Sequence, residues 1–275
     1  MSEAANPAGP ANPAGPADAT GAADTSGPKG TAAPKGAVGP DDPANAVVRL
    51  LWSPAPKPTR GPKPALSLER IAAAGVEIAD AEGLGAVSMQ KVAGLLEFTK
   101  MSLYRYVPGK AELVALMVES AAGDPPAAGP ELGWREQLTA WARLLAGSFD
   151  RHPWLLDATV GPRVIGPREL AWLERVVAAL DGHGLTGPER MDAAVLLAGH
   201  VRSIAEQSRA AGPDGSPEAD LLAALGTVVH RHADRYPAVA AAMAEPGGRD
   251  QALDFGLERI LDGLAALISR RTGAA

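Results

Sequence analysis

The chain has 275 residues, a formal net charge of −6 and no cysteine. This length suffices for one or two domains with a sizeable core, and the lack of thiols excludes disulfides and thiolate metal sites. The negative charge excludes a general polyanion binder, so any nucleic-acid contact must use a locally basic surface. No apolar run approaches the roughly 20 residues that cross a bilayer, and no secretory signal opens the chain. We therefore expect a soluble cytoplasmic protein.

The first part of the chain, up to about residue 46, is dominated by Ala, Gly and Pro. It contains a tandem repeat, Ala-Asn-Pro-Ala-Gly-Pro, at 5–10 and again at 11–16. This segment offers almost no large apolar side chains to bury, so it cannot offset its ordering entropy. We predict a disordered leader.

A short apolar cluster at 47–52 interrupts this leader and is a candidate to dock on the folded body. The stretch 53–64 that follows is extended by its prolines. Its basic side chains are Lys57, Arg60 and Lys63. Such an arm either reaches the backbone or minor groove of DNA or is a solvated linker. We expect residues 1–59 to form a disordered tail with a basic arm.

Hydroxyl residues mark the beginnings of three expected helices. Ser67, Ser88 and Thr99 stand where an N-cap side chain accepts a backbone hydrogen bond. Gly83 suits the end of the first helix, a Pro-Gly pair stops the third, and Lys110 opens a fourth. The second and third helices are short and separated by a tight turn. This is a helix-turn-helix, in which one helix crosses the DNA backbone and the next enters the major groove.

Apolar residues at helical spacing predict which faces of these helices are buried. In the short third helix, Leu103 and Val107 should point inward, because one apolar stripe must hold the helix in place. The other expected core positions are Ile71, Ala74, Gly75, Ile78, Met89, Val92, Ala93, Leu96, Leu113, Leu116 and Met117.

The rest of the chain alternates long helical patterns with Pro and Gly breaks, and shows no alternating strand pattern of useful length. A run rich in Pro at 124–130 marks a boundary. Helices are expected near 131–150, 154–160, 167–181, 188–210, 217–235, 237–244 and 249–270. We predict an all-α protein with a helix-turn-helix domain at 60–122 and a C-terminal helical domain at 130–271.

The run Met-Ser-Leu-Tyr-Arg-Tyr-Val-Pro-Gly-Lys-Ala-Glu-Leu at 101–113 resembles the DNA-binding signature of the TetR/AcrR family of bacterial regulators. Residues 69–84 are similar to the first helix of that family, and 60–64 to the arm that often precedes it. The strong match covers about 60–120. It is specific because several unusual residues fall in one register, which a lone helix-turn-helix pattern would not provide.

A weaker match to the C-terminal domain of the TetR-like branch continues at 151–155 and 172–180. The resemblance implies a homodimeric, ligand-responsive repressor, with three DNA-binding helices and a C-terminal effector pocket. Operator DNA, a small-molecule effector and a second copy of the chain are the implied partners. The matching DNA-contact positions are Ser88, Gln90, Thr99, Lys100, Ser102, Tyr104, Tyr106 and Lys110. Hydroxyls and lysines suit phosphates, and Gln90, Lys100 and Ser102 suit base edges.

One position departs from the family pattern. Glu97 stands in the helix-turn-helix turn, where the family commonly has Gly. A left-handed backbone there would cost a non-Gly residue about 1 kcal/mol, and the carboxylate would weaken attraction to phosphates. Between residues 57 and 112 the chain has eight basic and six acidic side chains, so basic charge is concentrated where DNA contact is expected.

Two C-terminal helices, near 188–210 and 249–270, carry apolar stripes that suggest a subunit interface. Burial inside one subunit explains either helix alone equally well, and the resemblance favours a dimer. Candidates for effector contacts are Trp141, Phe149, His152, Trp154, Trp172, His200, Arg202 and Gln207. Each has an alternative role, since aromatic residues at helical spacing are usually core and a lone His is often hydrogen-bonded there. We expect no metal site and no cofactor, because no spaced His, Asp and Glu cluster is present.

Three functions compete at this point. The first is a transcriptional repressor released from DNA by a small ligand. The second is an α-helical enzyme, although no paired carboxylates, Ser/His/Asp arrangement or phosphate-binding Gly loop supports it. The third is a dimeric ligand-binding or interaction protein with a non-functional helix-turn-helix, supported by Glu97 and the net acidity. Salt-dependent, sequence-specific DNA binding separates the first from the others.

Overall fold

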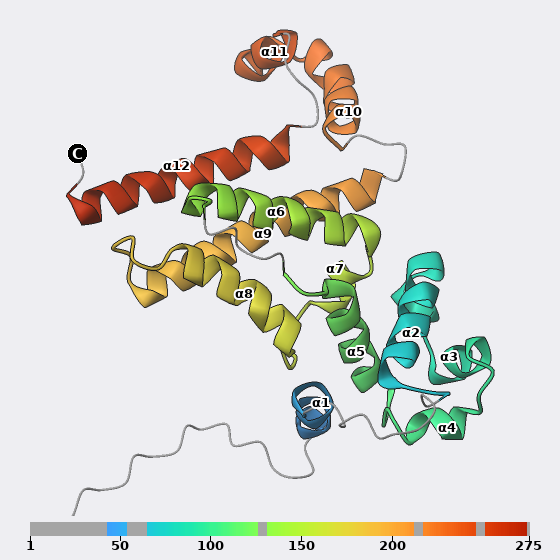
Figure 1. Cartoon of the computed structure of the whole chain (residues 1–275). Helices are drawn as coiled ribbons and strands as arrows, with labels where there is room; N and C mark the ends of the chain where they lie inside the picture. Colours follow the sequence, from blue (N-terminus) through green and yellow to red (C-terminus); the bar gives the residue numbers. More distant parts are fainter. Residues whose placement is uncertain (1–42, 54–64, 126–130, 212–216, 246–250, 274–275) are drawn as a thin grey trace, which may run out of the picture. The chain divides into compact units, whose positions relative to one another are not determined.

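In a computed structural model of the protein, every regular element of the described residues is helical, as the sequence predicts (Figure 1). The structure describes residues 43–53, 65–125, 131–211, 217–245 and 251–273. The leader repeat, the basic arm and most of the expected boundary run lie outside these residues. The all-α fold class is confirmed.

Hydroxyl caps begin three consecutive helices, at the residues that the sequence indicates. Ser67, Ser88 and Thr99 each accept a hydrogen bond from the backbone N–H three residues later, at 3.2 or 3.3 Å. These bonds satisfy donors that a helix start leaves unpaired, so even short helices begin at defined residues. The elements of this part are α2 (Leu68–Glu82), the 3-10 helix η1 (Leu84–Ala86), α3 (Met89–Leu95), α4 (Lys100–Tyr104) and α5 (Lys110–Ala122).

A fully buried apolar core holds these helices together. α2 packs against α3 and α5, and α3 packs against α4. Among the completely buried side chains are Ile71, Val92, Leu103, Val107 and Leu113, all at positions that the sequence predicts to be buried. A five-residue helix has little stability of its own, so Leu103 and Val107 determine how α4 is held.

The helices expected in the C-terminal part are all present, with ends that differ by a few residues. They are α6 (Trp134–Arg151), α7 (Leu155–Ala158), α8 (Pro167–Ala179), α9 (Gly187–Ala211), α10 (Pro217–Arg231), α11 (Pro237–Ala244) and α12 (Ala252–Thr272). α9 packs against α6, α8 and α12, and its Leu197 and Val201 are completely buried. α10 packs against α9 and α11.

α5 connects the helix-turn-helix to the C-terminal helices. It packs against α2 on one side and against α7 and α8 on the other. The helix that ends the first expected domain is therefore also part of the packing of the second. The domain limits 60–122 and 130–271 stay a prediction.

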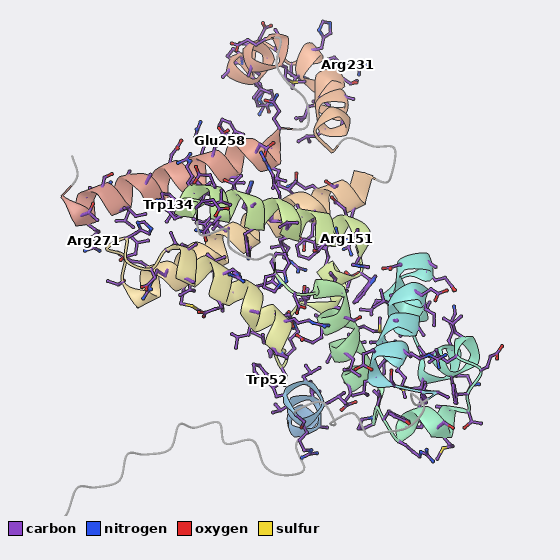
Figure 2. The ribbon with its side chains drawn as sticks, in the orientation of Figure 1. Trp52, Trp134, Arg151, Arg231, Glu258 and Arg271 are labelled. Atoms are coloured by element: carbon purple, nitrogen blue, oxygen red, sulfur yellow. The ribbon has the colours of Figure 1, made fainter. Side chains whose placement is uncertain are left out.

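The segment before the basic arm corrects one expectation. Residues Pro43–Trp52 form a helix, α1, although they fall within the range 1–59 predicted to be a disordered tail. α1 packs on α5 and buries Val47, and Trp52 lies near its end (Figure 2). The Trp52 indole N–H donates to the Ile165 carbonyl at 3.1 Å. The docking hypothesis for the cluster 47–52 is confirmed. The prediction of disorder was wrong for this part, because its apolar face finds a surface on α5.

Within the ranges described, no helix is both long and apolar enough to cross a membrane.

Candidate functional site

The turn between α3 and α4 has an unusual backbone at Glu97. Its φ is 61°, and it is the one non-glycine residue with positive φ among those described. The Phe98 N–H donates to the Ala93 carbonyl at 2.9 Å and closes the turn. The left-handed turn considered in the sequence analysis is therefore present, and Glu97 occupies it at a cost of about 1 kcal/mol.

One face of α4 is free to meet a large partner. Leu103 points into the core, and the opposite face exposes Lys100, Met101 and Tyr104. The Lys100 ammonium lies 5.5 Å from the centroid of the Tyr104 ring. A cation, an apolar tip and a phenol thus share one exposed helix face, a set that suits phosphate, thymine methyl and base-edge contacts.

The other residues predicted to contact DNA lie around this face with differing exposure. Ser88, Gln90, Thr99 and Lys110 are exposed, as are Lys100 and Tyr104. Ser102 and Tyr106 are half-buried, and the Ser102 hydroxyl lies 2.8 Å from the Thr99 hydroxyl. Two of the hydroxyls already accept helix-capping bonds but keep a proton to donate. DNA contact by these residues stays a prediction.

Met101 is a candidate DNA-contact residue that was not predicted from the sequence. Its side chain is 72% exposed, although a methionine at helical spacing is usually a core residue. The predicted inward position of Leu103 would have indicated that Met101 is exposed. Since residues two apart on a helix point in very different directions, an inward Leu103 turns Met101 outward.

A cavity of about 460 Å³ lies among α5, α6, α7, α8 and α9. Three aromatic side chains form part of its wall. The Trp141 indole N–H donates to the Trp172 carbonyl at 2.9 Å, and the two rings meet edge to face. The lining residues are Val118, Ala122, Trp141, Leu145, Ser148, Phe149, Leu155, Thr159, Arg163, Glu169, Trp172, Leu173, Ala194, Val195, Ala198, Gly199 and Arg202. This volume and apolar character suit a small organic molecule.

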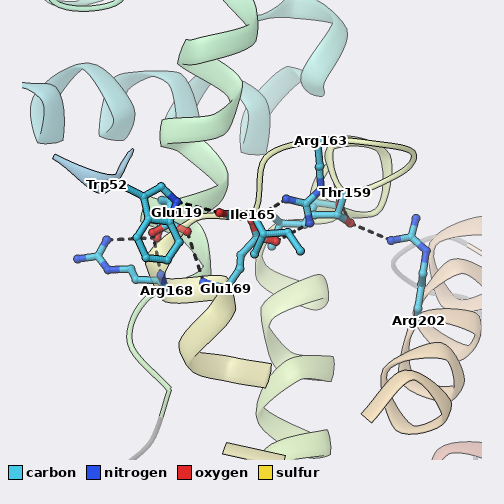
Figure 3. A network of polar contacts seen from close by, with 9 residues as sticks. Trp52, Glu119, Thr159, Arg163, Ile165, Arg168, Glu169 and Arg202 are labelled. Atoms are coloured by element: carbon cyan, nitrogen blue, oxygen red, sulfur yellow. Dashed lines mark hydrogen bonds and ion pairs between the residues drawn. The ribbon is translucent and has the colours of Figure 1, made fainter. Parts of the chain in front are cut away.

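Most polar side chains of the cavity lining belong to the segment 159–169 or bind it, and this side of the cavity is called its polar end; Figure 3 shows their contacts. The Arg202 guanidinium donates to the Thr159 hydroxyl at 2.9 Å and to the Leu156 carbonyl. Arg163 forms a two-pronged ion pair with Glu169, with an Nη1–Oε2 distance of 2.6 Å. A ligand therefore meets an apolar wall along most of its length and two guanidinium groups at this end.

The structure gathers half of the predicted effector residues at this cavity. Trp141, Phe149, Trp172 and Arg202 line it. Ligand contact by these four stays a prediction. Sequence reasoning missed Thr159, Arg163 and Glu169, because no local pattern brings them together.

The other four candidates lie outside the cavity lining. His152 Nδ1 lies 2.8 Å from the Asp80 carboxylate, and the Trp154 indole N–H donates to the same oxygen at 2.7 Å. Their polar atoms therefore connect α2 to the segment before α7. His200 Nε2 lies 3.0 Å from the Leu253 carbonyl, at the contact between α9 and α12. Gln207 is exposed, with its amide 3.4 Å from the Ser203 hydroxyl.

A buried carboxylate joins α5 to the start of α8. Gly166, the N-cap of α8, has no side chain to cap the helix, and Glu119 of α5 supplies the acceptor instead. Its two oxygens accept from the backbone N–H groups of Arg168 at 3.0 Å and Glu169 at 3.4 Å. A Cβ at Gly166 would lie 2.0 Å from this carboxylate. Burial raises the pKa of the Glu119 carboxyl, although the two backbone donors act in the opposite direction.

Apolar side chains of α9 and α12 face outward as well as inward. On α9, Met191 and Leu196 are exposed, and on α12 Phe255 is 63% exposed. These are the two helices on which the sequence predicts a subunit interface. Single exposed apolar residues are common, but a group on paired helices indicates a binding surface.

The fold and these sites together define a helix-turn-helix regulator with a ligand-sized cavity in its C-terminal part. In the part of the chain that the structure covers, no group of three His, Asp or Glu side chains could hold a metal ion.

Known transcriptional regulators are similar to most of the chain, and a family model matches its C-terminal part. The family model for the tetracycline-repressor-like C-terminal domain matches residues 126–268. The repressor DrrR1 of Streptomyces coeruleorubidus is 39% identical over 235 residues, which cover 82% of this chain and 87% of that protein. A transcriptional regulator of Saccharopolyspora erythraea is 30% identical over 209 residues, covering 74% and 86%.

A solved structure agrees with these sequence matches. The TetR family protein ActR of Streptomyces coelicolor, in complex with actinorhodin, aligns with a TM-score of 0.63 at 27% identity. The alignment covers 78% of this chain and 100% of ActR. The chain belongs to the TetR family of transcriptional regulators, as its signature at 101–113 indicates, and it is a DNA-binding regulator rather than an enzyme.

Proposed function

We propose that the protein is a homodimeric cytoplasmic repressor that reads its operator with α4 and leaves it when a small molecule occupies the cavity. The observation that carries this proposal is the pairing of an exposed α4 face with an apolar cavity that reaches α5. A relative named as a repressor and ActR bound to actinorhodin support it.

DNA reading follows from the chemistry of the helix-turn-helix. Lys100, Ser102 and Gln90 suit base edges, while Tyr104, Tyr106, Lys110 and the capping hydroxyls suit phosphates. Thr99 and Ser88 stand at helix N-termini, where backbone N–H groups also attract phosphate. Glu97 weakens this attraction without blocking the α4 face, because it lies in the preceding turn.

Dimer formation follows from the exposed apolar residues of α9 and α12. A second copy would cover Leu196 and Phe255 and place two α4 helices about 34–36 Å apart, the spacing of successive major grooves. The double variant Leu196→Glu and Phe255→Glu should be monomeric in light scattering, because it buries two charges in the interface. Leu132→Glu, at an exposed position before α6, should stay dimeric.

The experiment that tests DNA binding is selection of an operator followed by fluorescence anisotropy at two salt concentrations. We expect nanomolar, sequence-selective binding that weakens with salt and is lost in the double variant Lys100→Ala and Tyr104→Ala. A matched control exists, since Arg235 and Tyr236 also form a cation–ring contact at 5.5 Å, between α10 and α11. The double variant Arg235→Ala and Tyr236→Ala should bind normally.

The competing function, an interaction protein with a non-functional helix-turn-helix, predicts the opposite result. The wild-type protein would then show no preference over random DNA in the selection, and both double variants would behave alike.

A further inference from the structure

The charges at the polar end of the cavity are unequal. Two guanidinium groups, Arg163 and Arg202, line it together with one carboxylate, Glu169. Arg202 also pairs with Glu206 at 2.9 Å, but Glu206 is not part of the lining. A ligand at this end therefore meets an excess of positive charge and hydrogen-bond donors, which a carboxylate or phenolate matches.

The remaining wall has a different chemistry. Trp141, Phe149 and Trp172 contribute aromatic rings, and most other lining residues are aliphatic. Flat aromatic ligands pack well against such rings, in offset or edge-on arrangements. The cavity thus has one end for an acidic group and a body for an aromatic system.

The segment that carries Arg163 is held at three points by other parts of the chain (Figure 3). Arg202 holds it at Thr159, the Trp52 indole of α1 holds it at Ile165, and Glu119 of α5 holds the first turn of α8. Glu169 takes part in the last of these contacts and also in the cavity wall. Its side chain pairs with Arg163 in the cavity wall, and its backbone N–H donates to Glu119.

We propose that the effector is an aromatic acid whose anionic group binds Arg163 and Arg202, and that Glu119 transmits its arrival to α5. This inference rests on the proposed function of the cavity. The acidic group competes with Glu169 for Arg163, which loosens the first turn of α8. Since Glu119 binds that turn and α5 packs against α2, the change reaches the helix-turn-helix. Glu119 is a positioning residue here, because it does not line the cavity.

A second connection between the two parts provides a matched control. Asp80 of α2 accepts hydrogen bonds from the segment before α7, through His152 and Trp154. It joins the same two parts of the chain but touches neither Arg163 nor the first turn of α8. Replacing either acid by its amide removes one charge from one connection, and only Glu119 lies on the proposed route.

The ligand chemistry is tested with three probes of one shape: anthracene-2-carboxylate, anthracene-2-carboxamide and 2-(aminomethyl)anthracene. Binding is measured by quenching of tryptophan fluorescence. We expect the carboxylate to bind about tenfold more tightly than the carboxamide, with the amine weakest, because charge-assisted hydrogen bonds are the stronger ones. Arg163→Gln should remove most of this preference. Equal affinities, or tighter binding of the amine, would overturn the inference. Failure of all three probes to bind would overturn the cavity assignment itself.

The transmission step is tested by the ratio of operator affinities without and with saturating anthracene-2-carboxylate. Coupling between sites is commonly about 5- to 150-fold, so we expect at least a fivefold ratio for the wild type. In Glu119→Gln the ratio should fall close to one, while the affinity of the free protein for the probe stays within about twofold. Asp80→Asn should keep the wild-type ratio. A merely structural role for Glu119 would lower thermal stability and leave the ratio unchanged.

A second variant perturbs the same contact from the other side. Gly166→Ala places a methyl group against the Glu119 carboxylate and should lower the ratio as Glu119→Gln does. If Glu119→Gln and Gly166→Ala keep the wild-type ratio, Glu119 is not the transmitter. The same conclusion follows if anthracene-2-carboxylate binds the wild type without weakening its affinity for DNA. DNA binding without probe is measured in the same titrations, so failure of the proposed repressor function is seen separately.

Discussion

The helix-turn-helix and the junction between α5 and α8 are held by contacts of very different range. In the helix-turn-helix, the capping bonds of Ser67, Ser88 and Thr99 reach the third residue along the chain. At the junction, Glu119 binds backbone groups 49 and 50 residues away. The helix starts of the helix-turn-helix are thus stabilised by local bonds, whereas the start of α8 depends on a side chain from a distant part of the chain.

The two regions also differ in packing. In the helix-turn-helix, the side chains of Ile71, Val92 and Leu103 are completely buried. The C-terminal helices next to the junction surround a cavity of about 460 Å³. An unfilled apolar cavity lowers stability, and a ligand that fills it restores part of that loss. A closely packed DNA-binding region and a region with a cavity are thus combined in one chain.

The largest effect is expected from the core of the closely packed DNA-binding region. Leu103→Ala should lower the free energy of unfolding by about 2–5 kcal/mol, because it leaves a cavity under a five-residue helix. Met101→Ala, two residues earlier and exposed, should change it by less than about 0.5 kcal/mol. Urea unfolding of both variants checks this. Similar losses in the two would show that α4 is not packed through Leu103.

The turn at Glu97 should allow a gain in stability. Glu97→Gly removes the left-handed strain at φ 61° and should raise the free energy of unfolding by about 1 kcal/mol. Glu97→Gln keeps the strain and removes only the charge, so it should leave stability unchanged and tighten DNA binding. Urea unfolding and anisotropy separate the two effects. A gain from Gln equal to that from Gly would assign the cost to charge.

Met101 should read a thymine methyl group in the operator. Losing one buried methyl contact costs about 0.8 kcal/mol, which is about fourfold in affinity. Replacing the contacted thymine by deoxyuridine should therefore weaken wild-type binding about fourfold and leave Met101→Ala unaffected. Scanning each operator thymine by anisotropy locates the position. If deoxyuridine weakens both proteins equally at every position, Met101 makes no such contact.

The smallest effect is expected in acid, at the contact between α9 and α12. The Thr186 backbone N–H and the Arg271 guanidinium donate to Glu189 and lower the pKa of its carboxyl to about 2. Because the folded-state pKa is depressed, this stabilisation is present above about pH 4.5 and is lost as the pH falls toward 2. The difference in melting temperature between wild type and Glu189→Gln should shrink over that range. A pH-independent difference would contradict the prediction.

Much of the candidate site was predictable because α4 obeys local rules. Thr99 as a cap and Leu103 as the inward residue together determine which side of α4 faces out, and the signature at 101–113 names the family. Met101 was not predicted, because methionine is usually a buried residue. His200 and Gln207 were candidates for effector contact because a pocket needs some polar groups, but His200 contacts α12 and Gln207 is exposed.

From α2 onward, the sequence by itself determined the α-helices, the hydroxyl caps and the buried stripes of the helix-turn-helix, because these depend on residues within a few positions of one another. The tertiary structure alone decided which side chains surround the cavity, how Glu119 caps α8, and that Asp80 holds His152, 72 residues away. Such contacts depend on how helices are placed after the chain has folded back on itself. A pattern along the chain does not encode that placement residue by residue.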